Sequence, residues 1–420
     1  MTDSRDSMDS AVSNPPEVSN PAQVSNPPEV SNPAQVSNPA QVSNPAQVSN
    51  PPEVSNPAEV SNPPEIREPA HAPLAHVVRG GIIEGVHHGS VVVLAADGSV
   101  QFQAGDIEAA FYPRSALKPL QAVGLLRAGL PPLDDEALAL AAASHSGDER
   151  HLATARRMLA TAGLTDDALR NVPDLPYGPA ERDEWLRRGL GPTRLTQNCS
   201  GKHAAMVLTT LARGWRPDTY LDPDHPLQRE IAATVEDLTG QRIARVTVDG
   251  CGAPLFAVSL HGLTRAAARL GTAAPDTHEG RVAHAMRTHP EMVSGADRDT
   301  ARLVRAVPGL LAKDGFEGVQ IAALPDGRAV GVKIADGADR ARMPVTAAAL
   351  ARCGVDPDVL ADFAATPVIG GGAPVGALRA AGALSMPASP MHAPVSAPAS
   401  TSPSLSPSTS NSNSPSISAS

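Results

Sequence analysis

Ser115 and Lys118 stand three residues apart in the stretch Phe111–Gln121. On a helix this spacing lets the two side chains meet. A serine hydroxyl becomes an effective nucleophile when a base takes its proton, and a lysine can be that base where burial or a neighbouring cation lowers its pKa. Because a helix tolerates proline only near its first turn, Pro119 predicts that the helix begins close to Ser115. The backbone N–H groups at such a start could hold an oxyanion.

The same two residues also have a structural explanation. Serine is a preferred N-cap residue, so Ser115 could cap the helix while Lys118 extends into solvent. A second serine, Ser144, follows a predicted Ala/Leu-rich helix in the run Ser-His-Ser, and alone it could be an ordinary polar residue at the end of that helix. Taken one at a time, neither serine identifies a catalytic site.

Two cysteines lie at the ends of predicted elements. Cys199 and Lys202 precede helix-forming residues and are expected at a helix N-terminus, whereas Cys251 follows a predicted strand in the glycine turn that also holds Asp249. These residues supply fewer donors than the four Cys or His of a structural zinc site, so a metal site here would be open. Lys202 could bind a metal only as a neutral amine. Two buried structural thiols, or a disulfide, are the alternatives.

Hairpins are predicted at both ends of the folded region, around Asp97-Gly98 and Asp326-Gly327, because both turns lie between runs of alternating apolar residues. Helices are predicted between them at residues 134–144, 149–162 and 226–238, with a long loop at 171–196 that Pro and Gly interrupt. Antiparallel hairpins with helices grouped between them indicate an α+β fold. We expect an antiparallel sheet flanked by helices, with a helical region, and not a doubly wound sheet.

Both ends of the chain are predicted to be disordered. Nine hexads of the type Val-Ser-Asn-Pro-(Pro/Ala)-(Glu/Gln) run from Val12 to Glu65. Their prolines block helix and sheet, and one valine per hexad cannot build a core. Residues 1–70 are therefore expected to form an extended spacer, and residues 385–420, rich in Ser, Pro and Ala, a disordered tail. The folded part is predicted over residues 71–384.

Composition limits the partners of the chain. A formal net charge of −10 without a basic stripe, and an aromatic content of 2%, argue against nucleic-acid binding. The longest apolar run, Ala137–Ala143, is far too short to span a membrane, and the polar N-terminus does not resemble a signal peptide. Three cysteines in 420 residues suit a reducing compartment better than a disulfide scaffold. We therefore expect a cytoplasmic protein.

Four motifs occur in a fixed order along the chain. They are Tyr112-Pro-Arg-Ser-x-x-Lys-Pro-Leu-Gln, Ala143-Ser-His-Ser-Gly-Asp-Glu, Asn198-Cys-Ser-Gly-Lys-His-Ala and Val248-Asp-Gly-Cys-Gly-x-Pro. Together with a later Lys313-x-Gly-x-Glu-Gly, they resemble the rhizobial-type, zinc-containing L-asparaginases, the asparaginase II family. The resemblance covers about residues 73–384 and neither tail, and it implies a fold related to serine β-lactamases and serine-dependent glutaminases.

The resemblance implies hydrolysis of L-asparagine to L-aspartate and ammonia by a homodimer. Two Ser–Lys pairs would be catalytic, Ser115 with Lys118 and Ser144 with Lys313. One zinc ion per subunit would be held by Cys199, Lys202 and Cys251. The substrate site would be lined by Arg114, His203 and Asp249. Amide hydrolysis requires a nucleophile, a proton carrier and an oxyanion stabiliser, which the two pairs and the helix start could supply.

Other functions fit parts of the sequence. A β-lactamase or penicillin-binding relative, or a serine glutaminase, would also be a serine hydrolase of this fold, and Ser-x-x-Lys with a late Lys-x-Gly is typical of the first two. Lys313-Asp-Gly, however, matches Lys-Thr-Gly weakly, and no Ser-Asp-Asn stands between. A catalytically inactive, zinc-held scaffold is a further possibility, with the Pro-rich arm binding a partner that the sequence does not identify. The intact serines and lysines argue against that scaffold.

Overall fold

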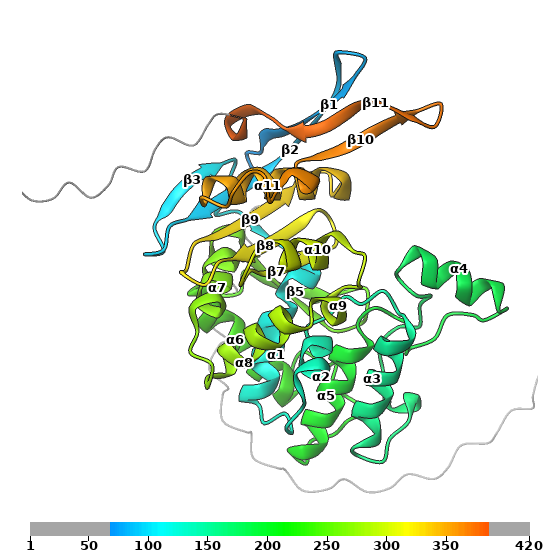
Figure 1. Cartoon of the computed structure of the whole chain (residues 1–420). Helices are drawn as coiled ribbons and strands as arrows, with labels where there is room; N and C mark the ends of the chain where they lie inside the picture. The colour runs from blue at the N-terminus through cyan, green and yellow to red at the C-terminus, as the bar shows by residue number, and fades with distance from the viewer. Residues whose placement is uncertain (1–67, 386–420) are drawn as a thin grey trace, which may run out of the picture. The chain divides into compact units, whose positions relative to one another are not determined.

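Strand β2 (Ile82–Leu94) is central to the main sheet in the computed structural model, which describes residues 68–385 (Figure 1). The sheet has the order β10-β11-β1-β2-β9-β8-β7, with β3 also paired to β2, and all neighbours are antiparallel. The remaining strands are β1 (Ala72–Arg79), β3 (Val100–Ala104), β7 (Leu311–Gly315), β8 (Val319–Ala323), β9 (Ala329–Ile334), β10 (Ala365–Gly370) and β11 (Ala373–Ala380).

Both predicted hairpins are confirmed. Gly98 turns the chain from β2 into β3 with φ of 82°, and Gly327 turns it from β8 into β9 with φ of 96°. Glycine adopts this left-handed conformation without the steric cost that a Cβ would add. With helices between the two hairpins, the predicted α+β class with an antiparallel sheet is confirmed as well.

Alternating residues of β2 bury the two faces of the sheet against different helices. Val91 and Val93 join the core beneath helix α11 (Asp339–Arg352), whereas Val92 and Leu94 pack toward helix α7 (Leu260–Thr272). This follows from the two-residue period of a strand, which sends successive side chains to opposite faces. The continuous apolar run of β2 is therefore typical of a strand that is covered on both sides.

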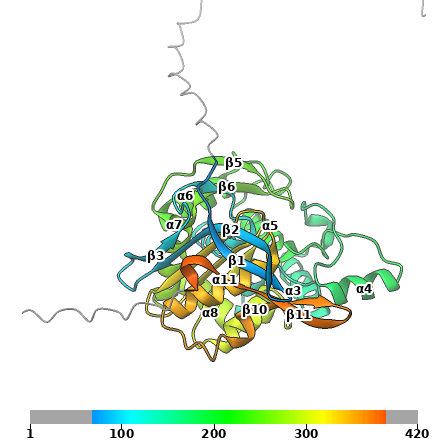
Figure 2. The ribbon, with the colours of Figure 1, turned by 90° about the horizontal axis from the view of Figure 1, so that it is seen from above.

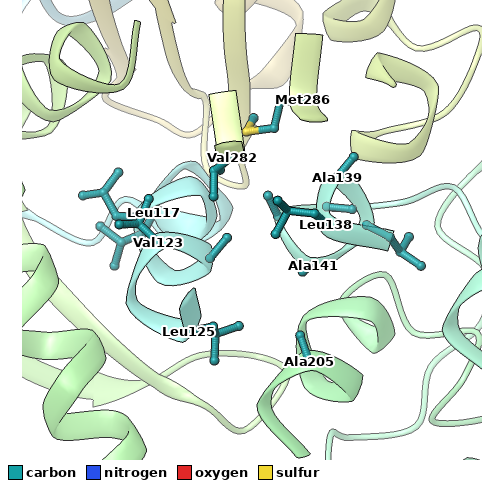
Figure 3. Packing of buried hydrophobic residues seen from close by; sticks show 14 of the residues in the cluster. Leu117, Val123, Leu125, Leu138, Ala139, Ala141, Ala205, Val282 and Met286 are labelled. Carbon is teal, nitrogen blue, oxygen red and sulfur yellow. The ribbon is translucent and has the colours of Figure 1, made fainter. Parts of the chain in front are cut away.

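A helical region packs around α1 (Lys118–Arg127), whose first nine residues are all buried. The helices that contact it are α2 (Asp135–Ala141), α5 (Ser200–Ala212), α6 (Pro226–Thr239) and α8 (His278–Thr288). Farther out, α3 (Glu149–Ala160) packs on α2 and α5, α9 (Pro290–Val293) packs on α2, and α10 (Asp299–Ala306) packs on α9. Figure 3 shows how leucine, valine and alanine side chains of α1, α2, α5 and α8 fill this core. At Gly201, an added Cβ would lie 2.4 Å from the Leu140 side chain, so the N-terminus of α5 is held directly against α2.

The predicted helices are confirmed, but the predicted loop at residues 171–196 is wrong in part. Helix α4 (Pro179–Arg187) lies within it, with Pro179 in its first turn. None of its residues is buried, and both views show it standing away from the rest of the described chain (Figures 1 and 2). A helix without a buried face has no apolar periodicity by which the sequence could reveal it.

A second, three-stranded sheet has the order β4-β6-β5, built from β4 (Ala110–Phe111), β6 (Pro254–Ser259) and β5 (Arg245–Val248). Strand β5 leads into the predicted glycine turn at residues 249–252. The disordered spacer and tail predicted for residues 1–70 and 385–420 lie outside the described residues, apart from 68–70 and Ser385. In the described part of the chain, the helices are too short or too polar to cross a membrane.

Candidate active site

Ser115 lies in a short 3₁₀ turn, η1 (Arg114–Leu117), which runs directly into α1. Pro119 occupies the first turn of α1, as predicted, but Ser115 caps neither helix, because the N-cap residues are Pro113 and Leu117 and neither makes a side-chain cap bond. The capping explanation of Ser115 is therefore wrong. Arg114, just before it, has φ of 53°, a left-handed conformation that is uncommon for any residue but glycine and often marks a functional site.

Ser144 is held between two lysine amines. Lys118 Nζ lies 3.0 Å from Ser144 Oγ, and Lys313 Nζ lies 3.1 Å from the same oxygen. Ser144, Lys118 and Lys313 are 3%, 1% and 0% exposed, so the group is closed to bulk solvent. A hydroxyl that contacts two amines can accept a hydrogen bond from one and donate to the other when that other is neutral. The arrangement can therefore move protons between two bases.

This arrangement differs from the pairing of Ser115 with Lys118 expected from the sequence. Lys118 donates to Ser144 Oγ and to the backbone carbonyl of Ala143, and no hydrogen bond joins it to Ser115 among the described residues. The solvent-exposed lysine of the capping explanation is equally wrong, because Lys118 is fully buried. Ser144 and Lys313 are in contact, as the second pair requires.

The Lys313 amine is also bound by the next residue of its own strand. Its Nζ lies 2.8 Å from Asp314 Oδ1, and the other oxygen of that carboxylate, Oδ2, accepts a hydrogen bond of 2.9 Å from Arg298. Burial lowers the pKa of Lys313 to about 8, although Asp314 opposes the shift. Burial alone would raise the pKa of Asp314, but the charges of Lys313 and Arg298 reverse that effect and lower it. Lys313 is thus poised to lose a proton near neutral pH.

Cys199, Lys202 and Cys251 form a second buried group. Cys199 is the N-cap residue of α5, Lys202 lies in the first turn of that helix, and Lys202 Nζ is 3.4 Å from Cys251 Sγ. The Cys199 Sγ lies 3.1 Å from Asn198 Oδ1. The interaction between the two sulfurs, helped by Lys202, lowers the pKa of Cys251 well below its usual value, and the same interaction raises the pKa of Cys199 to about 12. Both cysteines are free, so the disulfide alternative is wrong for this structure.

This donor set fits a zinc ion. Two sulfurs and one amine converge in a buried cluster, and Cys251 is already prepared as a thiolate, the form that binds a metal. Three protein donors leave a fourth position for another ligand, as in catalytic zinc sites. Among the described residues, no three His, Cys, Asp or Glu side chains gather as a potential metal site, so Lys202 would have to complete the set. Burial would lower the pKa of Lys202, but the charges of Cys251 and Cys199 raise it above its usual value, so the amine would have to lose its proton to the incoming metal.

A cavity of about 180 Å³ lies beside the two cysteines and is also bordered by Ser115, whereas Ser144 and its two lysines do not line it. Its walls consist of Arg114, Ser115, Asp174, Tyr177, Gln197, Asn198, Cys199, Asp249, Gly250, Cys251 and Phe316. Arg114 Nε donates to Asp249 Oδ1 at 2.8 Å, and its guanidinium lies 5.3 Å from the centre of the Phe316 ring. Burial would raise the pKa of Asp249, but Lys202 and Arg114 lower it, so the carboxylate is charged.

The structure places His203 away from this cavity. The side chain is fully buried on α5, where its Nδ1 lies 2.8 Å from the Tyr220 hydroxyl, and burial lowers its pKa. His203, which the resemblance implies in the substrate site, is therefore not among the residues that line this cavity. Of the expected substrate residues, Arg114 and Asp249 do line the cavity.

Sequence reasoning missed several residues of the site. Asp314 was inside the quoted Lys-x-Gly motif but unassigned, whereas Arg298 and Tyr177 belong to no motif. One unused signal was the scarcity of lysine: the chain has 34 Lys and Arg together, of which only four are lysines. Three of these four, Lys118, Lys202 and Lys313, are the buried amines described above. At these positions lysine supplies a compact amine that can lose its proton, which a guanidinium cannot do.

The L-asparaginase II family model matches residues 75–380. The chain belongs to this family. Membership supports an amidohydrolase that acts on a small molecule, and the match lies within the predicted folded part, residues 71–384. No curated protein matches the chain.

Three solved structures illustrate the partial similarity of this chain to known structures. The native form of Mglu is 20% identical, with a TM-score of 0.27 and 60% of each chain covered, so this chain spans less than two thirds of its length. The glutaminase YbgJ of Bacillus subtilis, in a covalent complex with 5-oxo-L-norleucine, is 16% identical, with a TM-score of 0.26, 58% of this chain and 79% of that chain. A β-lactamase candidate of Bacteroides dorei DSM 17855 is 15% identical, with a TM-score of 0.34, 61% of this chain and 92% of that chain.

Proposed function

We propose that this family member hydrolyses the side-chain amide of L-asparagine, releasing L-aspartate and ammonia. The observation that carries the proposal is the relation between the two serines. Ser115 lies on the wall of a cavity of about 180 Å³. Lys118, three residues further along the chain, is one of the two lysines whose amines contact the buried Ser144 hydroxyl. An accessible hydroxyl and a separate proton carrier are the parts that acyl transfer requires.

In this proposal, Ser115 is the nucleophile. A neutral lysine amine takes the hydroxyl proton as Oγ adds to the carboxamide carbon. The C–N bond then breaks, an ester to Ser115 forms, and that proton passes to the leaving nitrogen, which departs as ammonia. Water then cleaves the ester, which yields the carboxylic acid and restores the Ser115 hydroxyl. The backbone N–H of Ser115 precedes the first hydrogen bond of its 3₁₀ turn, from Ala116 N to Pro113 O, and is available for the developing oxyanion.

Arg114 and Asp249 are proposed to bind the charged ends of the amino-acid substrate. They are paired with each other on the cavity wall and carry the opposite charges that an α-carboxylate and an α-ammonium need. Arg114 is fixed by Asp249 on one side and by the Phe316 ring on the other. The residue next to the nucleophile therefore already has one orientation before substrate binds.

Cys199, Lys202 and Cys251 are proposed to hold one zinc ion. When bound, it would supply a positive charge that attracts and polarises oxygen atoms of a ligand. Cys199 and Cys251 reach the cavity wall, whereas Ser144 does not, so this group is suited to binding substrate beside the serine chemistry.

The decisive experiment is turnover of three substrates by the full-length protein. Ammonia release from L-asparagine that Ser115→Ala abolishes would support the proposal. Nitrocefin hydrolysis without ammonia release would identify a β-lactamase, and faster release from L-glutamine would identify a glutaminase. Absence of all three activities from a folded, zinc-loaded protein would leave the scaffold. Two further expectations, the homodimer and the cytoplasmic location, are proposals tested by light scattering and by cell fractionation.

A further inference from the structure

Arg298 contacts the group around Ser144 and Lys313 but has no role in the proposed function. It is the N-cap residue of α10, and its side chain turns back toward the end of α2 and strand β7. The guanidinium contacts three groups: Nη2 donates to Asp314 Oδ2 at 2.9 Å, Nη1 donates to the Ser144 carbonyl at 3.3 Å, and the planar group lies 4.6 Å from the centre of the Tyr177 ring.

Two of these contacts fix the proton carriers. Asp314 binds Lys313 Nζ with Oδ1 and Arg298 with Oδ2, so the guanidinium determines how the carboxylate is turned and hence where the Lys313 amine points. The bond to the Ser144 carbonyl fixes the backbone that carries the Ser144 hydroxyl. Arg298 thus holds both partners of the 3.1 Å contact between Lys313 and Ser144.

The third contact reaches the substrate cavity. Tyr177 lies on the cavity wall and also borders an adjoining hollow of about 440 Å³ that Arg182 and Arg298 line. Its neighbours Pro176 and Gly178 are buried, and Gly178 N donates to the Ser146 carbonyl at 2.9 Å, so the backbone here is held while the Tyr177 side chain stays partly exposed. The ring is attracted to the guanidinium above it, so Arg298 biases the position of this partly exposed side chain.

We infer that Arg298 is a positioning residue that aligns Lys313 with Ser144 and at the same time holds Tyr177 against the substrate cavity. This inference deepens the proposed function and rests on it. It goes beyond that function by joining the cavity wall to the proton carriers through one side chain. Movement of Tyr177 by a bound substrate then reaches Asp314, and through it Lys313.

The sign of the expected effect follows from the charges around Lys313. Asp314 faces it from its own strand, Lys118 from α1 and Arg298 from the start of α10, while Arg342 of α11 acts on the far side of Asp314. Asp314 raises the pKa of Lys313, and the two cations lower it. Loss of Arg298 removes one cation and leaves Lys313 without a competitor for Asp314, so the pKa of Lys313 should rise. Loss of the Asp314 charge should lower it.

The scarcity of lysine makes a direct test possible. Full-length protein with ¹³C at lysine Cε gives four lysine signals, and Lys313→Met identifies one of them. In Arg298→Met, the titration of Lys313 should move up by about one pH unit, the usual size of a neighbouring-charge effect. Asp314→Asn should move it down, and Arg298→Lys should restore much of the wild-type midpoint. The matched control is Arg302→Met, because Arg302 also stacks on an aromatic ring and faces an aspartate, Asp362, but lies outside the site.

Kinetics supply the second readout. For L-asparagine, Arg298→Met should lower kcat by about tenfold to a hundredfold, the range of a misplaced proton carrier, and Tyr177→Ala should raise KM more than it lowers kcat. An Arg298→Met protein with wild-type Lys313 titration and wild-type kcat would overturn the inference. If that variant does not melt cooperatively, Arg298→Gln replaces it, since the amide can still donate to Asp314. A wild-type protein without amidase activity would refute the proposed function, while the NMR titrations would still decide the role of Arg298.

Discussion

The two serines of the site occupy opposite environments. Ser115 borders the cavity, and its hydroxyl has no hydrogen-bond partner among the described residues. Ser144 is buried, is absent from the cavity wall and contacts two lysine amines at 3.0 and 3.1 Å. Access to substrate and access to bases are therefore divided between the two residues. A hydroxyl that must attack benefits from being free, whereas one that passes protons benefits from fixed partners.

The two serines should also differ in what a mutation changes: the chemistry at Ser115, but the buried polar network at Ser144. A change at Ser115 removes an atom that reacts but almost no packing. A change at Ser144, Lys118 or Lys313 alters a buried polar network, in which an unpaired group costs about 1–3 kcal/mol. Activity and stability should therefore respond differently at the two serines, and each prediction below tests that difference.

The largest effect is expected for Ser115→Ala. The rate of ammonia release from L-asparagine should fall by about 10³-fold or more, because the nucleophile is lost. The melting temperature should stay near wild type, since the residue caps neither helix. Ser99→Ala, in the exposed β2–β3 turn, is the control. Substantial turnover by Ser115→Ala would transfer the role of nucleophile to Ser144 and reverse the comparison.

Ser144→Ala should reduce turnover by about 10²–10⁴-fold, the range of a lost proton carrier. Lys118→Met and Lys313→Met should have effects of similar size, and the double variant Ser144→Ala/Lys118→Met should be little worse than either single one, because residues acting as a unit are not additive. Ser146→Ala is a matched control, since Ser146 is buried two residues away and bonds only a backbone carbonyl. Multiplying losses would show that Lys118 and Ser144 act separately, against the observed contact.

Zinc binding should depend on Cys199, Lys202 and Cys251 and not on either serine. Purified wild-type protein should contain about one zinc per subunit, Cys251→Ser should contain almost none, and Ser115→Ala should retain all of it. A ligand that binds only the folded state stabilises it, so a chelator should lower the wild-type melting temperature and leave that of Cys251→Ser unchanged. Cys353→Ser is the control, because Cys353 is buried in the core beneath α11. Full zinc content in Cys251→Ser would refute the donor set.

The pH dependence should identify Lys313. If its neutral amine accepts the proton, kcat should rise with pH through about 8, where the buried amine loses its charge. Below that pH the amine is protonated and the rate should fall tenfold per unit. Lys313→Met should remove this rise from whatever activity is left. A wild-type profile that is flat from pH 6 to about 9 would mean that Lys313 stays charged during turnover.

The smallest effect is expected from the ends of the chain. A protein of residues 71–384 should keep the turnover and cooperative melting of the full chain, because the hexads and the Ser/Pro/Ala tail lack the apolar residues to build a core. Comparing kcat, KM and melting temperature of the two proteins tests this. A marked loss in the short protein would mean that a tail reaches one of the two serines.

The sequence predicted which residues belong to the site better than it predicted which of them contact one another. Ser115, Lys118, Ser144 and Lys313 could all be named, because each lies in a motif. That Lys118 contacts Ser144 could not, since the two are 26 residues apart and meet only after α1 and α2 have packed. The same applies to Arg298, 154 residues from Ser144 along the chain.

The fold shows a similar division. The hairpins around Gly98 and Gly327 follow from local turn chemistry and an alternating pattern, and both were predicted. Helix α4 has no buried residue, so its sequence resembles a loop. His203 lies in a motif, yet the turn of α5 directs it to Tyr220 and not to the cavity. A residue's place in a motif thus predicts that it lies near the site, whereas the direction of its side chain depends on its position along the helix that carries it.

The four lysines give the protein an unusual surface. Three of them are sealed inside the site, and Lys333 is half-buried with its amine bonded to the backbone carbonyls of Glu317 and Ile334. Reagents that acylate or cross-link amines will therefore find almost no side chain to modify on the folded protein. A protease that cuts after lysine should be as ineffective, while one that cuts after arginine has many exposed sites. Conjugation to a support or a polymer would have to use carboxylates or the chain terminus, and it would leave the three buried amines untouched.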